Sequence, residues 1–204
     1  MALIMPRYLV CITGASGALY SLRLVSALAS RGATLHLACS PWGARVILEE
    51  TGRPLGYWLG KVRASGGPSG GPAIVNYHPF DDFSSPLASG SFRLDATVVI
   101  PCSIGTLGSL ASGTSSNLIH RAGAVALKEG WPLILVPRET PLSLVTIRTM
   151  ETLKESGAVL LPAIPSFYAK PQTIEQLVDT VVNRILDHLG LPEASAFRWG
   201  EGPR

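Results

Sequence analysis

The feature that most constrains the fold is a regular alternation, along the whole chain, of short apolar runs with helix-length amphipathic segments. The apolar runs are rich in β-branched residues and predict buried strands over 8–13, 34–39, 96–101, 133–137 and 158–161. The intervening segments predict helices over 18–31, 42–51, 117–129, 143–156 and 173–189. Strands that alternate with helices in this way form a parallel sheet with helices on both faces. We therefore predict an α/β fold with a doubly wound parallel sheet.

The composition fits a chain that builds one large core. Its 204 residues are 47% hydrophobic and only 15% charged, and this low charge suggests that identical subunits cover part of the surface. We expect one domain over 1–190 with a Gly/Pro/Ser-rich surface excursion near 52–72, and a tail over 191–204 that packs at a subunit interface. No apolar run reaches the ~18 residues of a membrane-spanning helix, so we expect no membrane partner. The net charge of +3 comes without a basic block, so we expect no nucleic-acid partner either.

The N-terminus and the cysteines point to a reducing compartment. Pro6 and Arg7 interrupt the first apolar residues, which favours a buried strand over a signal peptide. Cys11, Cys39 and Cys102 are odd in number and widely spaced, so we expect buried free thiols and a cytoplasmic protein. The four histidines lack the spacing of a metal site, and we predict no metal.

Small and hydroxyl-bearing residues follow the predicted strands, at the sheet edge where doubly wound proteins bind ligands. The turn from Thr13 to Gly17 lacks the G-x-G-x-x-G pattern of dinucleotide sites, but it offers free N–H groups at a helix start. Two interpretations of this turn stay open. It could hold an anion or a cofactor, or it could be a tight turn that needs Gly for packing. Ser103 follows another strand and is more readily an N-cap than a ligand contact. Ser40 adds a third hydroxyl at the same edge.

Charged residues near this edge offer phosphate contacts. Arg138 and Glu139 lie between Pro137 and Pro141, which fix the backbone around them, and an Arg in a held geometry suits a phosphate. Three further cations could be solvated surface charges or could bind a phosphate: Arg121, Lys128 and Arg184. Periodicity leaves both roles open, because it cannot show whether these side chains meet at one site. The Tyr168 hydroxyl, after the last predicted strand, is a further possible donor.

Taken together, these segments resemble the UbiX-type flavin prenyltransferases. The motifs that carry the resemblance are Thr13-Gly-Ala-Ser-Gly17, Pro101-Cys-Ser103, Asn117-Leu-Ile-His-Arg121, Val136-Pro-Arg-Glu-Thr-Pro141, Phe167-Tyr168-Ala-Lys-Pro-Gln172 and Arg198-Trp-Gly-Glu201. They span nearly the whole chain in the family's order. The resemblance implies a Rossmann-like fold of the flavoprotein type, assembled into dodecamers.

The resemblance also implies an activity. Reduced FMN is bound as a substrate, and a dimethylallyl group from dimethylallyl phosphate is joined to its N5 and C6 without a metal. The product is prenylated FMN, the cofactor of UbiD-type decarboxylases. The implied FMN contacts are Gly14, Ala15, Ser16, Ser40, Ser103, Ile104, Gly105, Thr106 and Arg138. The implied prenyl-phosphate contacts are Lys128, Glu139, Tyr168, Arg184 and, across a subunit boundary, Arg121.

Glu50 matches the family's catalytic carboxylate, with Ser16 as its partner in proton transfer. Glu49 is adjacent, and successive helix residues point about 100° apart, so only one of the two can face the site. Glu49 lies four residues after Arg45, whereas Glu50 shares its face with the apolar Val46. The periodicity therefore predicts that Glu50 faces inward.

Two other functions stay open. A flavin-dependent decarboxylase would need a catalytic His and an Asn-containing substrate motif, which are not apparent in this sequence. A non-catalytic FMN carrier would need neither Glu50 nor the basic residues. Residues 52–83 depart from the family's pattern, and Phe83 stands where some relatives have Trp. Both dimethylallyl monophosphate and diphosphate remain open as donors.

Overall fold

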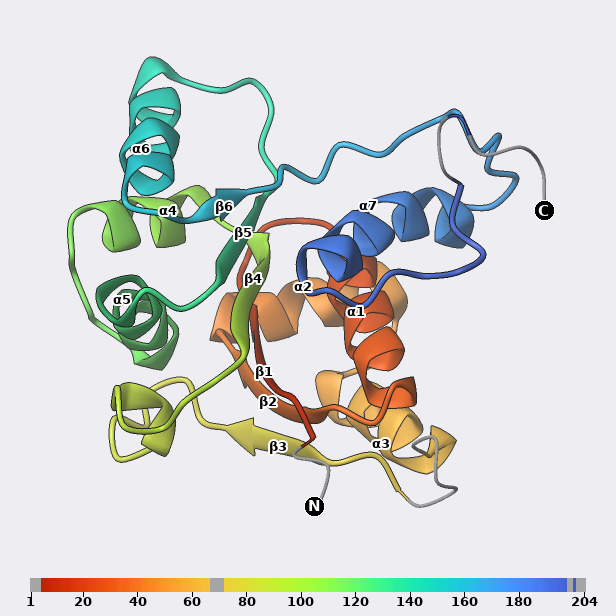
Figure 1. The fold of residues 1–204 in the computed structure, drawn as a ribbon, viewed down its shortest axis with the longest axis horizontal. Helices are drawn as coiled ribbons and strands as arrows, with labels where there is room; N and C mark the ends of the chain where they lie inside the picture. Colours follow the sequence, from red (N-terminus) through yellow and green to blue (C-terminus); the bar gives the residue numbers. More distant parts are fainter. Residues whose placement is uncertain (1–4, 67–71, 198–199, 201–204) are drawn as a thin grey trace.

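The computed structural model describes residues 5–66, 72–197 and 200, and its centre is a parallel β-sheet (Figure 1). Within these residues six strands pair in the order β3-β2-β1-β4-β5-β6, and every pair is parallel. Their bounds are Arg7–Ile12 (β1), Thr34–Cys39 (β2), Val75–His78 (β3), Ala96–Cys102 (β4), Leu133–Pro137 (β5) and Val159–Leu160 (β6). The strand order reverses between β1 and β4, which confirms the predicted doubly wound sheet and places its ligand-binding edge there.

Helices cover both faces of the sheet, because side chains along each strand point alternately to opposite sides. In β1, Val10 and Ile12 pack against one group of helices, and Leu9 and Cys11 pack against the other. The first group is α1 (Ala18–Ser30), α2 (Pro41–Thr51), α3 (Leu55–Ser65) and α7 (Ile174–His188). The second is α4 (Ile104–Ala111), α5 (Leu118–Glu129), α6 (Leu144–Glu155) and the 3₁₀ turn η1 (Pro86–Ala88). Figure 1 shows the two groups on opposite sides of the sheet.

The predicted elements are all present, and each boundary lies within one residue of the observed one. Four further elements were missed: α3, β3, η1 and α4. The segment near 52–72 was expected to be a surface excursion, but α3 lies within it. Leu59 and Val62 of α3 are buried in the core against α1 and the sheet. Gly56 and Gly60 interrupt the amphipathic pattern of this helix, so the sequence did not predict it.

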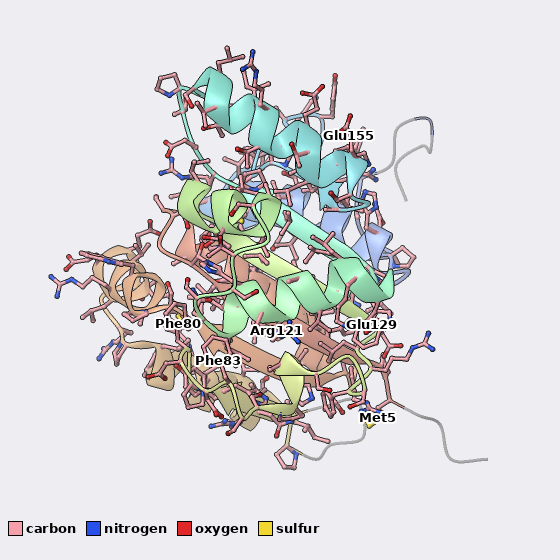
Figure 2. The ribbon with its side chains drawn as sticks, turned by 90° about the vertical axis from the view of Figure 1, so that its left-hand side faces the viewer. Met5, Phe80, Phe83, Arg121, Glu129 and Glu155 are labelled. Carbon is pink, nitrogen blue, oxygen red and sulfur yellow. The ribbon has the colours of Figure 1, made fainter. Side chains whose placement is uncertain are left out.

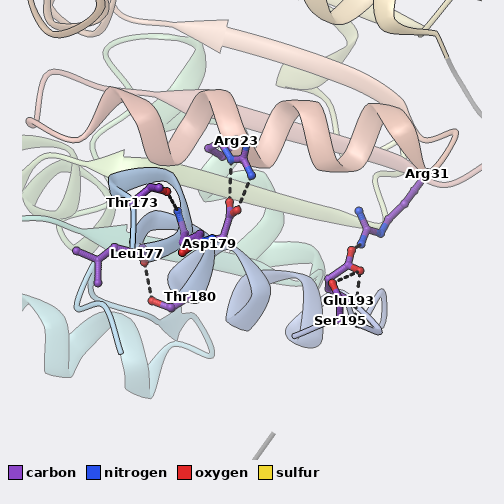
Figure 3. Close-up of polar contacts among 9 residues, drawn as sticks. Arg23, Arg31, Thr173, Leu177, Asp179, Thr180, Glu193 and Ser195 are labelled. Carbon is purple, nitrogen blue, oxygen red and sulfur yellow. Dashed lines mark hydrogen bonds and ion pairs between the residues drawn. The ribbon is translucent and has the colours of Figure 1, made fainter. Parts of the chain in front are cut away.

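The tail after α7 packs on its own subunit over the residues described. Glu193 forms an ion pair with Arg31 at the end of α1, and Ser195 donates to the same carboxylate (Figure 3). Arg23 and Asp179 form a second ion pair that joins α1 to α7, with Arg23 Nε 2.8 Å from Asp179 Oδ1. Most of the family-like Arg198-Trp-Gly-Glu201 motif, and residues 67–71 of the Gly-rich segment, lie outside the described residues.

The three cysteines are buried free thiols, as predicted. Cys11, Cys39 and Cys102 are buried and unbonded, and burial raises the pKa of their thiols, to about 12 for Cys39. These thiols therefore stay protonated at neutral pH and pack as apolar groups. No helix of the described chain is both long and apolar enough to cross a bilayer.

Candidate active site

Thr13 joins the ends of β1 and β4 at the point where the strand order reverses. Its buried hydroxyl donates a hydrogen bond to the Pro101 carbonyl at 2.7 Å and accepts one from the Ser103 N–H at 2.8 Å. The Thr13 side chain therefore replaces backbone pairing at the point where strands β1 and β4 diverge. Sequence reasoning placed Thr13 in the first turn but missed this bridge, since the partner lies 88 residues away.

The predicted hydroxyl residues start the helices that point at this edge. Ser40 accepts a hydrogen bond from the Gly43 N–H at 2.9 Å, and Ser103 accepts one from the Thr106 N–H at 3.3 Å. The N-cap interpretation of Ser103 is thus confirmed, and Ser40 has the same role. A Cβ added to Gly105 would meet no described atom within 4 Å. The first turn of α4 is therefore open to a ligand.

The first turn requires glycine for two physical reasons. A Cβ on Gly14 would lie 2.6 Å from the Cβ of Trp42, which begins the helix after β2, so the packing explanation holds at this position. Gly17 has φ +110°, a left-handed conformation that side chains disfavour. Trp42 is 73% exposed and lies beside the turn. Sequence reasoning overlooked Trp42, because an aromatic after a proline at a helix start carries no special signal.

Glu50 points from α2 into the same turn. Its carboxylate accepts two hydrogen bonds from the Gly17 N–H, at 2.9 and 3.1 Å, and one from the Ala18 N–H at 2.8 Å. Glu49 faces away and pairs with Arg45 at 2.5 Å. The predicted inward orientation of Glu50 is thus confirmed. Two of the N–H groups that an anion cradle would have offered to a ligand are used by this carboxylate, whose charge suits the positive end of the α1 dipole.

Arg138 follows β5 and brings a partly buried cation to the same edge. Its Nε is buried and has no hydrogen-bond partner among the described residues. Burial raises the pKa of Tyr20 on α1, and the nearby charge of Arg138 partly opposes that rise. A buried guanidinium nitrogen without a partner is costly unless an acceptor satisfies it. A flavin phosphate is such an acceptor, so this residue fits the implied cofactor.

A cavity of about 360 Å³ lies next to Arg138. It is lined by the end of β5, by the loop from β5 to α6, by Met150 of α6 and by the segment 162–165. Glu139 lies at its rim, and the Glu139 carboxylate accepts a hydrogen bond from the Thr140 N–H at 3.0 Å. The Arg138–Glu139 pair predicted from the flanking prolines therefore does line a cavity at the sheet edge.

The other predicted phosphate contacts are divided between two faces of the subunit. Arg184 on α7 pairs with Asp187 at 2.7 Å and lines a cavity of about 520 Å³. Tyr168 stacks on Phe197 near the same cavity, with ring centroids 6.5 Å apart. These residues belong to the α7 side of the sheet.

Arg121 and Lys128 lie on α5, on the opposite side of the sheet. Arg121 Nε donates to the Ala88 carbonyl at 2.9 Å, and Lys128 pairs with Glu129 at the far end of the helix (Figure 2). One subunit therefore does not bring the four predicted cations and Tyr168 together. That Arg121 acts across a subunit boundary stays a prediction. No group of three His, Cys, Asp or Glu side chains suited to a metal ion occurs in the described part of the chain.

Comparisons with known proteins place this geometry in a family. A family profile described as Flavoprotein matches residues 4–186. Flavin prenyltransferase UbiX of Pseudomonas aeruginosa is 44% identical over 197 residues, which cover 96% of this chain and 94% of the relative. Flavin prenyltransferase UbiX of Halalkalibacterium halodurans is 41% identical over 95% of this chain and 93% of the relative.

Solved structures agree. AnUbiX (PadA1), solved in complex with FMN and dimethylallyl pyrophosphate, superposes with a TM-score of 0.87 at 37% identity, over 97% of this chain and 99% of that one. A dodecameric FMN-dependent UbiX-like decarboxylase from Escherichia coli O157:H7 gives 0.84 at 36% identity, over 96% and 99%. The cysteine decarboxylase TvaF, at 20% identity and 0.59, shares the fold alone. The chain belongs to the flavoprotein family, among the UbiX flavin prenyltransferases.

Proposed function

We propose that this protein is a flavin prenyltransferase that joins a dimethylallyl group from dimethylallyl phosphate to N5 and C6 of reduced FMN. The product, prenylated FMN, would serve a UbiD-type decarboxylase. The observation that carries the proposal is the Glu50 carboxylate, fixed by the Gly17 and Ala18 N–H groups beside the strand edge. The carboxylate stabilises the start of α1, and prenyl transfer in addition needs a base at this place, which a protein that only carries FMN does not.

The strand edge offers a set of groups that fits FMN. The buried Nε of Arg138 needs an acceptor, and the flavin phosphate would supply one. Three further groups would complete the site: the small residues that follow β1, the N-caps of α2 and α4, and the open first turn of α4. These residues are Gly14, Ala15, Ser16, Ser40, Ser103, Ile104, Gly105 and Thr106.

The chemistry needs cations and a base. When bound, reduced FMN supplies the two nucleophilic atoms. Departure of an allylic phosphate is helped by groups that stabilise the leaving oxyanion, and Arg121, Lys128 and Arg184 would do so with Tyr168 and Glu139. Closing the ring onto C6 needs a proton added to the prenyl double bond and a proton lost from C6, and Glu50, with Ser16 as relay, would move these protons. Apolar walls around the prenyl group exclude water, which would otherwise capture the allylic cation.

We infer that the site is completed by neighbouring copies in a homo-oligomer, as in the dodecameric relative. Two observations support this. The proposed phosphate contacts lie on opposite faces of one subunit. Large apolar side chains are also exposed over α6, the 162–173 segment and the start of α7: Leu144, Val145, Ile147, Ile164, Phe167 and Ile174. We also propose that the protein works in the cytoplasm.

A second function has an observation in its favour. Two similar solved structures, at 36% and 37% identity, are described as decarboxylases. One experiment separates the candidates: anaerobic incubation with reduced FMN and, in parallel, dimethylallyl phosphate, dimethylallyl diphosphate or candidate carboxylates, followed by mass spectrometry of the flavin. We expect FMN to gain one dimethylallyl unit. Carbon dioxide release with unchanged flavin mass would instead indicate a decarboxylase, and no change in either would indicate a carrier.

The shared site has its own test. Arg121→Ala and Glu50→Gln should each have very low activity alone. Mixing the two variants under conditions that allow subunit exchange should restore part of the activity, since some sites would receive both intact residues. No recovery despite demonstrated exchange would argue against a site built across subunits.

A further inference from the structure

A hydrogen-bonded chain of three side chains lies outside the site described above. His36 Nδ1 is 2.9 Å from His78 Nε2, and His78 Nδ1 is 2.8 Å from Ser85 Oγ. His36 lies within β2, His78 ends β3 and Ser85 is the N-cap of η1. His36 and Ser85 are buried. The chain therefore ties the edge of the sheet to the η1 turn.

The surroundings hold the chain in place. The Phe92 ring meets the His36 imidazole edge-on, with centroids 5.2 Å apart at 84°, and the Arg7 guanidinium lies 5.3 Å from the Phe92 centroid. Burial is the main cause that lowers the pKa of His36, to about 4, with His78 and Arg7 adding to it. Burial also lowers the pKa of His78, which Asp82 partly opposes. Both imidazoles are thus neutral near pH 7, when each can donate one hydrogen bond and accept another.

Further hydrogen bonds connect this chain to Arg121. The Ser85 hydroxyl accepts from the Leu87 N–H at 3.4 Å, and the Ser85 carbonyl accepts from the Ala88 N–H at 3.0 Å. The Ala88 carbonyl then accepts from Arg121 Nε at 2.9 Å. The same segment also contacts the start of α5, where the Leu118 N–H donates to the Phe80 carbonyl at 2.9 Å. Figure 2 shows Phe80 on the segment that runs alongside Arg121 and its helix.

We propose that His78, held between His36 and Ser85, is a positioning residue for Arg121. It fixes η1 so that the Ala88 carbonyl engages Arg121 Nε, which sets the direction of the guanidinium group. A guanidinium binds phosphate through two nitrogens in a fixed plane, so its orientation decides the strength of the contact. His78 thereby controls affinity for the prenyl phosphate, a consequence that rests on the function proposed above.

The test compares His78→Leu, His78→Gln and Ser85→Ala with the parent and with His188→Gln, a control at an exposed histidine on α7. We expect His78→Leu to raise the KM for dimethylallyl phosphate about tenfold, the scale of one weakened charge-assisted contact. The Kd for FMN should not change, and kcat should change less than KM. His78→Gln, which keeps a donor and an acceptor, should recover part of the loss, and Ser85→Ala should show the same pattern more weakly.

Hydrogen exchange gives a readout that does not need activity. In His78→Leu and Ser85→Ala, peptides covering 80–92 and 118–123 should exchange faster, while the buried strand 34–39 should keep its protection. Unchanged exchange in those peptides would overturn the proposal, as would parallel losses of FMN binding and kcat, which indicate a general structural defect. If the parent forms no prenylated flavin but the two variants still exchange faster than it does in those peptides, the proposed function is refuted and the positioning of Arg121 is supported.

Discussion

Replacing Glu50 by Gln changes one carboxylate oxygen into an NH₂ group at the start of α1. The carboxylate accepts three hydrogen bonds, two from Gly17 and one from Ala18. An amide has a single acceptor oxygen, and its NH₂ group cannot accept a hydrogen bond. With the amide oxygen in the Oε1 position, the Ala18 N–H loses its acceptor; in the Oε2 position both N–H groups keep one, but the NH₂ group then lies against the Gly17 N–H. Either way a favourable contact is lost, and the positive end of the helix loses a negative charge.

The size of the effect follows from this geometry. Loss of a side-chain acceptor at a helix start costs about 1 kcal/mol, and loss of the charge adds about 0.3–1 kcal/mol. Glu50 is exposed, so we take a total of about 1–1.5 kcal/mol from the low end of both ranges. Glu49→Gln is a matched control, since it removes only the exposed pair with Arg45, worth about 0.3–0.5 kcal/mol.

Thermal unfolding and product formation test this reasoning together. For a chain of this length, about 1 kcal/mol shifts Tm by roughly 2–4 °C, so Glu50→Gln should lower Tm by about 2–6 °C and Glu49→Gln by less than about 2 °C. Protein concentration must be equal, because subunit association contributes to Tm. Glu50→Gln should also bind FMN yet form prenylated FMN much more slowly. If Glu49→Gln lowers Tm and product formation more than Glu50→Gln does, the assigned roles are wrong.

Three further outcomes are expected. Thr13→Val should lower the free energy of unfolding by about 1–3 kcal/mol in urea, because the Ser103 N–H loses its acceptor, and Thr13→Ser should lower it less; equal losses would show that the hydroxyl is unimportant. Because the pKa values of His36 and His78 are lowered in the fold, the unfolded chain binds more protons in acid than the folded chain does. The free energy of unfolding should therefore be highest above pH ~6.5 and fall towards pH 4. His36→Phe should flatten this dependence, and an unchanged slope would contradict the assignment. EDTA should leave prenyl transfer intact, and loss of activity that Mg²⁺ restores would point to metal-dependent diphosphate chemistry.

The sequence predicted most of the fold because burial on both faces of a parallel sheet produces long apolar runs. The same periodicity placed Glu50 inward and Glu49 outward, as found. It failed for α3, where two glycines interrupt the helical pattern, and for β3, which lies at the sheet edge and is only partly buried. Local pattern is weak wherever burial is incomplete.

The candidate site was less predictable, since it depends on contacts between residues far apart in the chain. Periodicity places Arg121 on a helix face, but it cannot show that Arg184 lies across the sheet from it. The His36–His78 contact joins residues 42 positions apart. Neither histidine carries a local signal, because each acquires its partner only when β2 and β3 pair.

The two edges of the sheet have a consequence for how copies of this chain associate. β3 has four residues and β6 has two, so each edge offers few free backbone groups for pairing with another strand. Extension of the sheet from one molecule to the next, a route to fibrous aggregation, is therefore disfavoured at both ends. Exposed apolar side chains such as Val145 and Ile164 must then be covered by helix and loop packing. Contacts of that kind depend on complementary shape and favour assemblies that close and stop growing.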